Sequence, residues 1–257
     1  MDPDCSRARY AAESLIKSYG IDEPAEIDVA AISFDRGIMV REHAIDGAEG
    51  WLLRREHRGV VRVRSDTAEL GRKRFTVAHE LGHWELHSQS VGRTVCSPAS
   101  VHGYKGDAAE IEASAFASEL LMPTYLFRPQ SRTRDVSLVA IRSLAEAFNT
   151  TLTATAVRYV EESRDPCIVI FSSDGRVNWV RRSQPGGGLW VAPRTEIPDD
   201  SFASDPPDVG EGANGMQEVE YSVWFPEGKP RHSGQLWEES IRLGEYDVVM
   251  TLLCLVE

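Results

Sequence analysis

The pattern of apolar residues changes period along the first 65 residues. From Ser6 to Tyr19 apolar residues recur at helical spacing, and Gly20 stands where a helix C-cap is expected. A shorter helix is predicted over 28–32. Apolar and polar residues then alternate in three segments separated by turn dipeptides, which predicts a small antiparallel sheet. The three segments are 38–42, 51–55 and 59–64.

Helical spacing returns in the centre of the chain. We expect Asp66 to begin a helix, with Glu69 three residues later as its capping partner. This helix continues through 75–88, where apolar residues occupy most sides, so it should be largely buried. The periodicity then vanishes over 89–106, which predicts a long loop of the kind that often borders an active site. A strongly helix-forming segment follows, and Pro123 ends it.

The second half of the chain contains two more helices and then a β-rich module. A helix, a polar turn and a second helix over 137–160 have the pattern of a helix-turn-helix unit. Beyond residue 162 we predict a hairpin and further strands, interrupted at 193–217 by a mobile acidic connector rich in Pro, Asp and Gly. The hairpin strands are 167–171 and 177–180, and the further strands are 219–225, 236–243 and 248–256. The fold class is therefore α+β.

The buried central helix contains the sequence His-Glu-Leu-Gly-His at 79–83. Residues four apart lie one above the other on a helix, so His79 and His83 can bind the same metal ion. Glu80 follows the first histidine, and its carboxylate can take a proton from a water molecule that the metal activates. A buried helix rarely carries His and Glu side chains without a partner. The pattern therefore predicts two metal ligands and a catalytic base.

Hydrolytic zinc sites usually take three protein ligands, so a third donor is expected from another element. Glu110 and Glu112, in the helix that Pro123 ends, are the two candidates. They lie about 200° apart around a helix, so both cannot reach one metal ion. Glu110 shares a face with Ala113 and Ala117, two small residues that would allow close approach to the helix that carries the two histidines. Periodicity alone leaves the choice between the two glutamates open.

Three more polar side chains lie near the motif in sequence. His87 continues the face of the two motif histidines, but a ligand one further turn along a straight helix would be about 6 Å more distant. In metzincins the third histidine lies ten residues after the first, a position that Gln89 occupies here. We therefore expect His87 to pack beside the site and not to bind the metal. His102 and Tyr104, in the long loop, are candidates to polarise a substrate carbonyl.

Composition narrows the class of protein. With 257 residues, 42% hydrophobic and 26% charged, the chain can form one large domain or two ordinary ones. No apolar run approaches the roughly 20 residues of a membrane span, and the N-terminus has no apolar signal core, so a cytoplasmic protein is expected. The net charge of −12 argues against direct nucleic-acid binding, and Arg158 is the only cation in the second helix of the helix-turn-helix-like unit. Four scattered cysteines form no Cys-x-x-Cys pair, so neither a disulfide framework nor a cysteine zinc site is indicated.

Two long motifs occur in a characteristic order. The first is Arg-Phe-Thr-Val-Ala-His-Glu-Leu-Gly-His at 74–83, and the second is Glu-x-x-Ala-x-x-Phe-Ala-x-x-Leu-Leu-Met-Pro at 110–123. Together they closely resemble the ImmA/IrrE family of zinc metallopeptidases. The resemblance spans residues 1–162 and implies a zincin-like catalytic domain of the gluzincin type. Residues 163–257 would then form a separate C-terminal module.

The resemblance also implies roles for individual residues. It implies that His79, His83 and Glu110 hold the metal and that Glu80 is the catalytic base. Glu112 would then be a glutamate on the helix surface. Zinc is the implied ion, although Mn²⁺ and Fe²⁺ suit the same set of two histidines and one carboxylate.

The function that follows is an intracellular zinc endopeptidase with a narrow protein substrate. The family resemblance suggests that this substrate is a helix-turn-helix transcriptional repressor, whose cleavage relieves repression. The alternative is a regulatory or sensor protein that keeps the metal site for structure, has little activity and acts through protein–protein contacts. We expect neither membrane association nor direct contact with nucleic acid, and the sequence indicates no oligomeric state.

Overall fold

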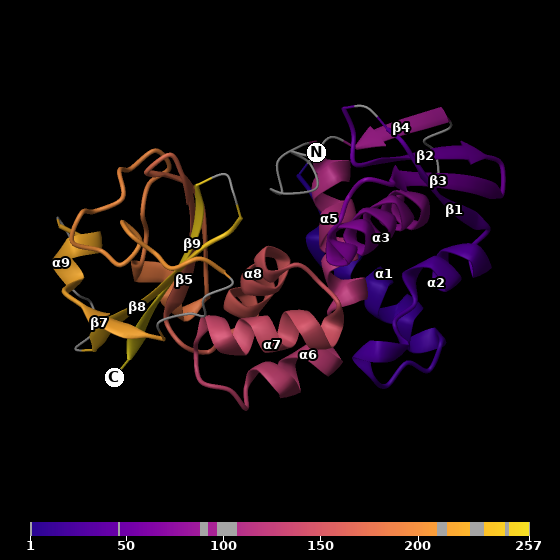
Figure 1. Ribbon diagram of the computed structural model, residues 1–257. Helices are drawn as coiled ribbons and strands as arrows, with labels where there is room; N and C mark the ends of the chain where they lie inside the picture. The colour runs from indigo at the N-terminus through magenta and orange to yellow at the C-terminus, as the bar shows by residue number, and fades with distance from the viewer. Residues whose placement is uncertain are drawn as a thin grey trace. The chain divides into compact units, whose positions relative to one another are not determined.

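The chain divides into two compact units, each with its own sheet (Figure 1). The first unit comprises Met1–Phe127 and Glu146–Thr151, and the second comprises Arg128–Ala145 and Leu152–Glu257. The computed structural model describes residues 2–45, 47–87, 92–96, 107–209, 215–226, 234–244 and 247–256. Of the helices in these ranges, none has both the length and the hydropathy that crossing a membrane requires. The α+β fold class is confirmed.

In the first unit, helix α3 packs between a four-stranded sheet and helix α5, and α1 packs on α5 (Figure 1). Its helices are α1 (Cys5–Ser18), η1 (Pro24–Glu26), α2 (Val29–Asp35), α3 (Leu70–Leu86), α5 (Ala108–Leu121) and the beginning of α6 (Thr124–Ser131). Its strands are β1 (Ile38–His43), β2 (Gly50–Arg55), β3 (Arg58–Arg64) and β4 (Gly92–Cys96), in the order β1-β3-β2-β4. Alternate residues of β3 (Gly59, Val61 and Val63) are buried, as a strand with one covered face requires.

The sheet differs from the prediction at both edges. Strand β2 is antiparallel to β3, as expected. It is also antiparallel to β4, which lies inside 89–106, the segment predicted to be a loop, and β1 runs parallel to β3, with Ile38 opposite Gly59. The physical reason lies in the connections. A tight turn joins β2 to β3, which enforces an antiparallel pair, whereas β1 and β2 lie on opposite sides of β3, so no hairpin turn constrains the direction of β1.

Side-chain caps explain several helix starts. Asp4 accepts a hydrogen bond from the Arg7 N–H at the start of α1, and Asp107 caps α5 by accepting from Ala109 and Glu110. The prediction that Asp66 begins the next helix is wrong, because α3 begins at Leu70. The carboxylate of Asp66 pairs with Arg64 at 2.8–2.9 Å and so does not cap, and Glu69 occupies the N-cap position without a side-chain cap bond.

The C-terminal end of α3 is fixed to the sheet through an aromatic ring. The Arg54 guanidinium of β2 lies 4.1 Å from the centre of the Trp84 ring and donates a hydrogen bond to the Trp84 carbonyl oxygen. Gly59 lies beneath the same ring, since a Cβ added there would be 2.8 Å from Trp84. These contacts hold α3 against the strands over the turn that follows the His-Glu-Leu-Gly-His sequence.

The second unit is built on a five-stranded antiparallel sheet of order β6-β5-β9-β8-β7, with α8 packed on β5 and β6. Its helices are the end of α6, most of α7 (Leu138–Phe148), α8 (Leu152–Glu162), η2 (Pro185–Gly188) and α9 (Tyr221–Trp224). Its strands are β5 (Cys167–Ser173), β6 (Arg176–Arg182), β7 (Gln217–Val219), β8 (Gln235–Arg242) and β9 (Val248–Val256). The predicted hairpin is β5–β6, where Asp174 and Gly175 both have positive φ (51° and 68°), as a two-residue hairpin turn requires.

Two C-terminal segments differ from the prediction. The strand expected over 219–225 ends at Val219, and α9 follows because Trp224 turns into the core. The structure describes 193–209 and 215–217 of the predicted connector. The first part has no helix or strand but packs on the unit, with Ala203 buried, whereas Gln217 at the end of the second part begins β7. Composition indicated the absence of regular structure, whereas the core contact of Ala203 comes from packing.

The predicted helix-turn-helix-like unit corresponds to α7 and α8. The boundaries between the two compact units differ from the domain boundary expected after residue 162. The reason is that α8 packs on strands of the C-terminal sheet. A domain boundary at residue 162 therefore remains a prediction, distinct from the division by packing.

A buried glutamate joins three segments of the second unit. Glu238 of β8 accepts hydrogen bonds from the Ala203 N–H at 2.8 Å, the Ser240 hydroxyl at 2.9 Å and the Trp224 indole N–H at 2.7 Å. Burial raises the pKa of Glu238, although these donors oppose the rise. Glu238 therefore stabilises the irregular segment, α9 and β8 together.

We expect Glu238→Ala to destabilise the second unit by roughly 3 kcal/mol, because two buried N–H donors would lose their acceptor at about 1–3 kcal/mol each. Hydrogen exchange of β8 and β9 amides measures the change. Glu218→Ala, which removes an exposed glutamate from the neighbouring strand β7, is the control and should have little effect. Equal protection in the two variants would contradict this account of Glu238.

Candidate metal centre

The structure brings His79, His83 and Glu110 together between α3 and α5. The His79 and His83 Nε2 atoms are 3.1 Å apart. Glu110 spans both rings, with Oε1 3.2 Å from His83 Nε2 and Oε2 3.3 Å from His79 Nε2. Within the described residues, these three form the group of His, Cys, Asp or Glu side chains that is close enough to share a metal ion.

The spacing of these atoms fits a tetrahedral metal site. Zinc binds His nitrogen and carboxylate oxygen at about 2.0–2.2 Å, so two ligands of a tetrahedron should be about 3.3 Å apart. The three measured separations of 3.1, 3.2 and 3.3 Å agree with that value. Three protein ligands also leave one position for water or substrate, as in catalytic zinc sites. The residues present therefore fit a zinc ion.

A glycine sets the distance between the two helices that carry the ligands. A Cβ added at Gly82 would lie 3.0 Å from the Ala113 carbonyl oxygen, 3.1 Å from Ala113 Cα and 3.2 Å from Phe116 Cβ. Gly82 lies in the first motif, and both contact residues lie in the second. The two motifs thus meet at one helix crossing, which explains why Glu110 reaches the histidines.

Hydrogen bonds hold the opposite edge of each imidazole. The Ser114 hydroxyl lies 3.2 Å from His79 Nδ1, and His87 Nδ1 lies 3.3 Å from His83 Nδ1. With their Nδ1 edges engaged, both rings turn Nε2 toward Glu110. Such contacts from outside the ligand set orient metal-binding histidines.

The protonation states that His79 and Glu110 favour are those that bind a cation. Burial lowers the pKa of His79, which favours the neutral imidazole that a metal requires. Burial alone would raise the pKa of Glu110, but its contacts with His79 and His83 outweigh this effect and hold the pKa well below its usual range. An ionised carboxylate therefore faces a neutral imidazole at neutral pH.

Glu80 is fully buried one residue after the first histidine. Its carboxylate lies beside the beginning of β2, where a Cβ added at Gly50 would be 3.7 Å from Glu80 Oε1 and 2.5 Å from Thr76 Cγ2. Gly50 thus leaves room for α3 and its carboxylate against the sheet. The predicted base lies between the ligand-bearing helix and the sheet.

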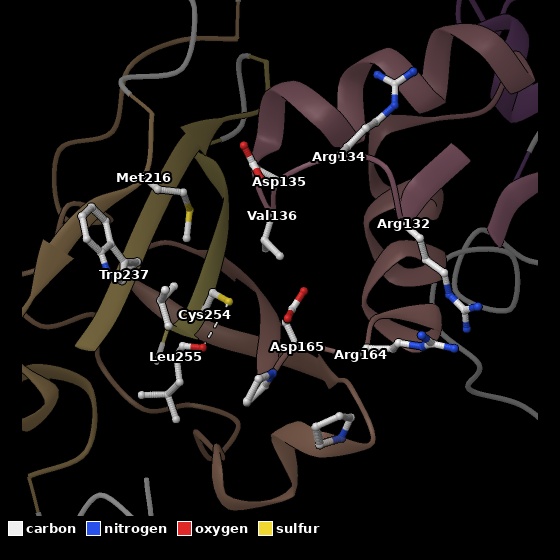
Figure 2. A pocket seen from close by; sticks show the side chains of 13 residues that line it. Arg132, Arg134, Asp135, Val136, Arg164, Asp165, Met216, Trp237, Cys254 and Leu255 are labelled. Carbon is white, nitrogen blue, oxygen red and sulfur yellow. Dashed lines mark hydrogen bonds between the residues drawn. The ribbon is translucent and has the colours of Figure 1, made fainter. Parts of the chain in front are cut away.

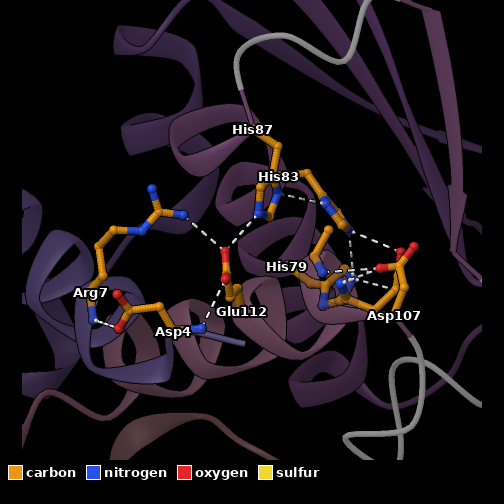
Figure 3. A network of polar contacts seen from close by, with 9 residues as sticks. Asp4, Arg7, His79, His83, His87, Asp107 and Glu112 are labelled. Carbon is orange, nitrogen blue, oxygen red and sulfur yellow. Dashed lines mark hydrogen bonds and ion pairs between the residues drawn. The ribbon is translucent and has the colours of Figure 1, made fainter. Parts of the chain in front are cut away.

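Glu112 differs from its predicted place on the helix surface. Only 8% of the residue is exposed, and its carboxylate accepts hydrogen bonds from the Asp4 N–H at 2.9 Å and from Arg7 at 2.9 Å. His87 Nε2 lies 3.0 Å from Glu112 Oε2, the oxygen that also accepts from Arg7 (Figure 3). The Asp4 N–H, followed by His87 and Arg7, lowers the pKa of Glu112 to about 2 despite its burial. A signal for burial was present, because α5 is apolar on most sides and a glutamate there needs partners.

The expectation that His87 packs beside the site agrees with these contacts. Its link to Glu112 was missed, because the sequence does not show that the start of α1 lies against α5. His102 and Tyr104 fall outside the described residues.

The second unit has a separate cleft of about 910 Å³ (Figure 2). Met216, Trp237 and Leu255 line one side of it, and Arg132 and Arg164 line the other. Asp135 and Asp165 also border the space, so the charges there are mixed. None of His79, Glu80, His83 and Glu110 lines this cleft.

Comparisons with known proteins bear on both fold and site. Residues 35–159 match the family model described as the IrrE N-terminal-like domain, a peptidase family. A solved structure titled "Mycobacterium tuberculosis transcriptional regulator" aligns with a TM-score of 0.62 over 97% of this chain and 88% of that chain. At 18% identity, this likeness concerns the fold alone. A search of curated proteins finds no match.

We expect Gly82→Ala to destabilise the first unit by about 1–3 kcal/mol through overpacking and to weaken zinc binding. The sign of the change in stability is informative, because a Gly→Ala substitution inside an unobstructed helix stabilises the protein by roughly 0.5–1 kcal/mol. Here the new methyl group would press on the backbone of Ala113 and move Glu110 away from the histidines. Chemical unfolding and a zinc-binding titration measure the two effects.

Gly71→Ala is the matched control for this prediction. Its Cβ would lie 2.7 Å from backbone atoms of Thr150 and Thr151, so it should also cost stability, but at the other end of α3. Folded Gly71→Ala protein should bind zinc like the wild type. Unchanged zinc affinity in Gly82→Ala would show that the α3–α5 distance does not determine the site.

Proposed function

Because residues 35–159 belong to the family of IrrE N-terminal-like peptidase domains, we propose that this chain is a zinc-dependent endopeptidase acting on a specific protein substrate. The observation that carries the proposal is the convergence of His79, His83 and Glu110 at the spacing of a tetrahedral site. Glu80, next to the first ligand, supplies the base that hydrolysis needs.

The chemistry divides between the ion and the protein. A zinc ion held by the three residues would polarise the scissile carbonyl and acidify a water molecule. Glu80 accepts the proton of the attacking water and passes it to the leaving amine nitrogen. Burial of Glu80 excludes bulk water and keeps its carboxylate at a defined place between α3 and the start of β2. Mn²⁺ and Fe²⁺ suit the same donors, and zinc is proposed on the family resemblance.

The proposed substrate is a helix-turn-helix transcriptional repressor, whose cleavage relieves repression. This part of the proposal rests on the resemblance of the two motifs to ImmA/IrrE peptidases. The helix-turn-helix-like pair of this chain is an unsuitable DNA reader, because Arg158 of α8 is fully buried and lies 3.4 Å from Glu162. We therefore propose that the protein acts on a repressor in the cytoplasm and not on the operator itself.

The activity should depend on Glu80 and on the metal separately. We expect Glu80→Gln to retain zinc and to lower the rate of peptide-bond cleavage roughly 10²- to 10⁴-fold, the usual contribution of a general base. Removing zinc with a chelator should abolish cleavage by the wild type, and adding zinc back should restore it. Mass spectrometry of new peptide termini, after incubation with a cell-derived protein mixture, measures cleavage and locates the bonds.

Glu85→Gln is the matched control. Glu85 lies on the same helix, in its last turn, and forms an ion pair with Arg36. The Glu85→Gln variant should cleave like the wild type. Cleavage sites confined to helix-turn-helix proteins would support the proposed substrate, whereas unrelated sites would contradict it. A zinc-loaded wild type that cleaves nothing would refute the peptidase function and favour a metal-binding regulator.

A further inference from the structure

A continuous chain of polar contacts leads from the metal centre to the start of α1 (Figure 3). His83 Nδ1 is 3.3 Å from His87 Nδ1, and His87 Nε2 is 3.0 Å from Glu112 Oε2. Glu112 in turn accepts from the Asp4 N–H and from Arg7 Nη2. These contacts join three helices, because His83 belongs to α3, Glu112 to α5 and Arg7 to α1.

The donors at the α1 end of this chain of contacts determine the direction of each hydrogen bond along it. Asp4 N–H and the Arg7 guanidinium can only donate, so they stabilise Glu112 as an ionised acceptor. An ionised carboxylate needs a donor from His87, which places the His87 proton on Nε2. The Nδ1 of a neutral His87 is then an acceptor.

The same logic continues to the metal ligand. Because His87 Nδ1 accepts, His83 must carry its own proton on Nδ1. The lone pair of His83 is therefore on Nε2, the atom that lies 3.1 Å from His79 Nε2 and 3.2 Å from Glu110. The opposite proton placement would turn the His87 Nε2 lone pair toward the Glu112 carboxylate, which is repulsive.

We propose that His87 and Glu112 are positioning residues that fix the tautomer and ring orientation of His83 for metal binding. The proposal rests on the proposed metallopeptidase function in one respect, that the site binds zinc. The two histidine ligands are held differently. A hydroxyl such as that of Ser114 beside His79 can donate or accept, whereas the ionised carboxylate of Glu112 can only accept and so imposes a direction on His83 through His87.

The start of α1 is part of this support. Asp4 caps α1 with its side chain, by accepting from the Arg7 N–H, and donates its own N–H to Glu112. Arg7 contributes the second donor, although about half of its side chain is exposed. The first turn of α1 therefore keeps Glu112 ionised and in place beside His87.

Zinc affinity tests the proposal without reference to catalysis. In titrations against a competing chelator, His87→Phe and Glu112→Leu should weaken zinc binding roughly 10- to 100-fold, the usual effect of losing an outer partner of a ligand. Glu112→Gln, which keeps one oxygen for His87, should fall between these variants and the wild type.

Glu119→Leu is the matched control, since Glu119 is another buried glutamate of α5 and accepts hydrogen bonds from Thr124. It should lose stability but keep wild-type zinc affinity. If Glu119→Leu weakens zinc binding as much as Glu112→Leu does, the effect reflects general destabilisation and the proposal is wrong.

A second readout needs no variant. Long-range ¹H–¹⁵N spectra of the imidazoles distinguish the two neutral tautomers, and zinc-loaded wild-type protein should show His83 with Nδ1–H and His87 with Nε2–H. A proton on His87 Nδ1 would overturn the proposal. A zinc-loaded wild type that does not cleave peptides refutes the peptidase function but leaves both readouts valid, whereas a wild type that binds no zinc refutes both proposals.

Discussion

The structure of the first unit depends on the close approach of α3 and α5 at Gly82. Ala113 and Phe116 occupy the space that any larger residue at position 82 would need. Glu110 reaches its ligand partners only because this crossing is tight, since a carboxylate one or two ångströms farther away could not lie within 3.3 Å of both rings. The distance between α3 and α5 therefore determines both the packing of these helices and the geometry of the metal centre.

Burial of so many polar groups at this crossing is costly unless each group is paired. The arrangement meets this requirement in layers, with Ser114 and His87 engaging the ligand rings and Glu112 engaging His87. The outermost layer, Arg7, is partly exposed and carries the positive charge that balances Glu112. The site is therefore supported by α1 as well as by the two helices that carry its ligands.

The elements predicted well are those with strong local signals. Asp4 and Asp107 cap α1 and α5 through bonds within one turn, and Asp174-Gly175 forms its hairpin turn from its own backbone preference. The elements predicted poorly depend on distant partners. Asp66 pairs with Arg64 and therefore does not cap a helix. Strand β1 is parallel to β3 because it lies on the opposite side of β3 from β2, where no hairpin turn constrains its direction.

The sequence by itself determined the ligand candidates, because the spacing of His79 and His83 places two imidazoles on one helix face whatever surrounds them. It also indicated Glu110, through the resemblance of two motifs that here meet at one helix crossing. Only the tertiary structure identified the partners of Glu112, which is a buried acceptor beside His87 and not the helix-surface residue that was predicted. The reason is that its donors lie 105 and 108 residues away, and no local pattern encodes a contact of that separation.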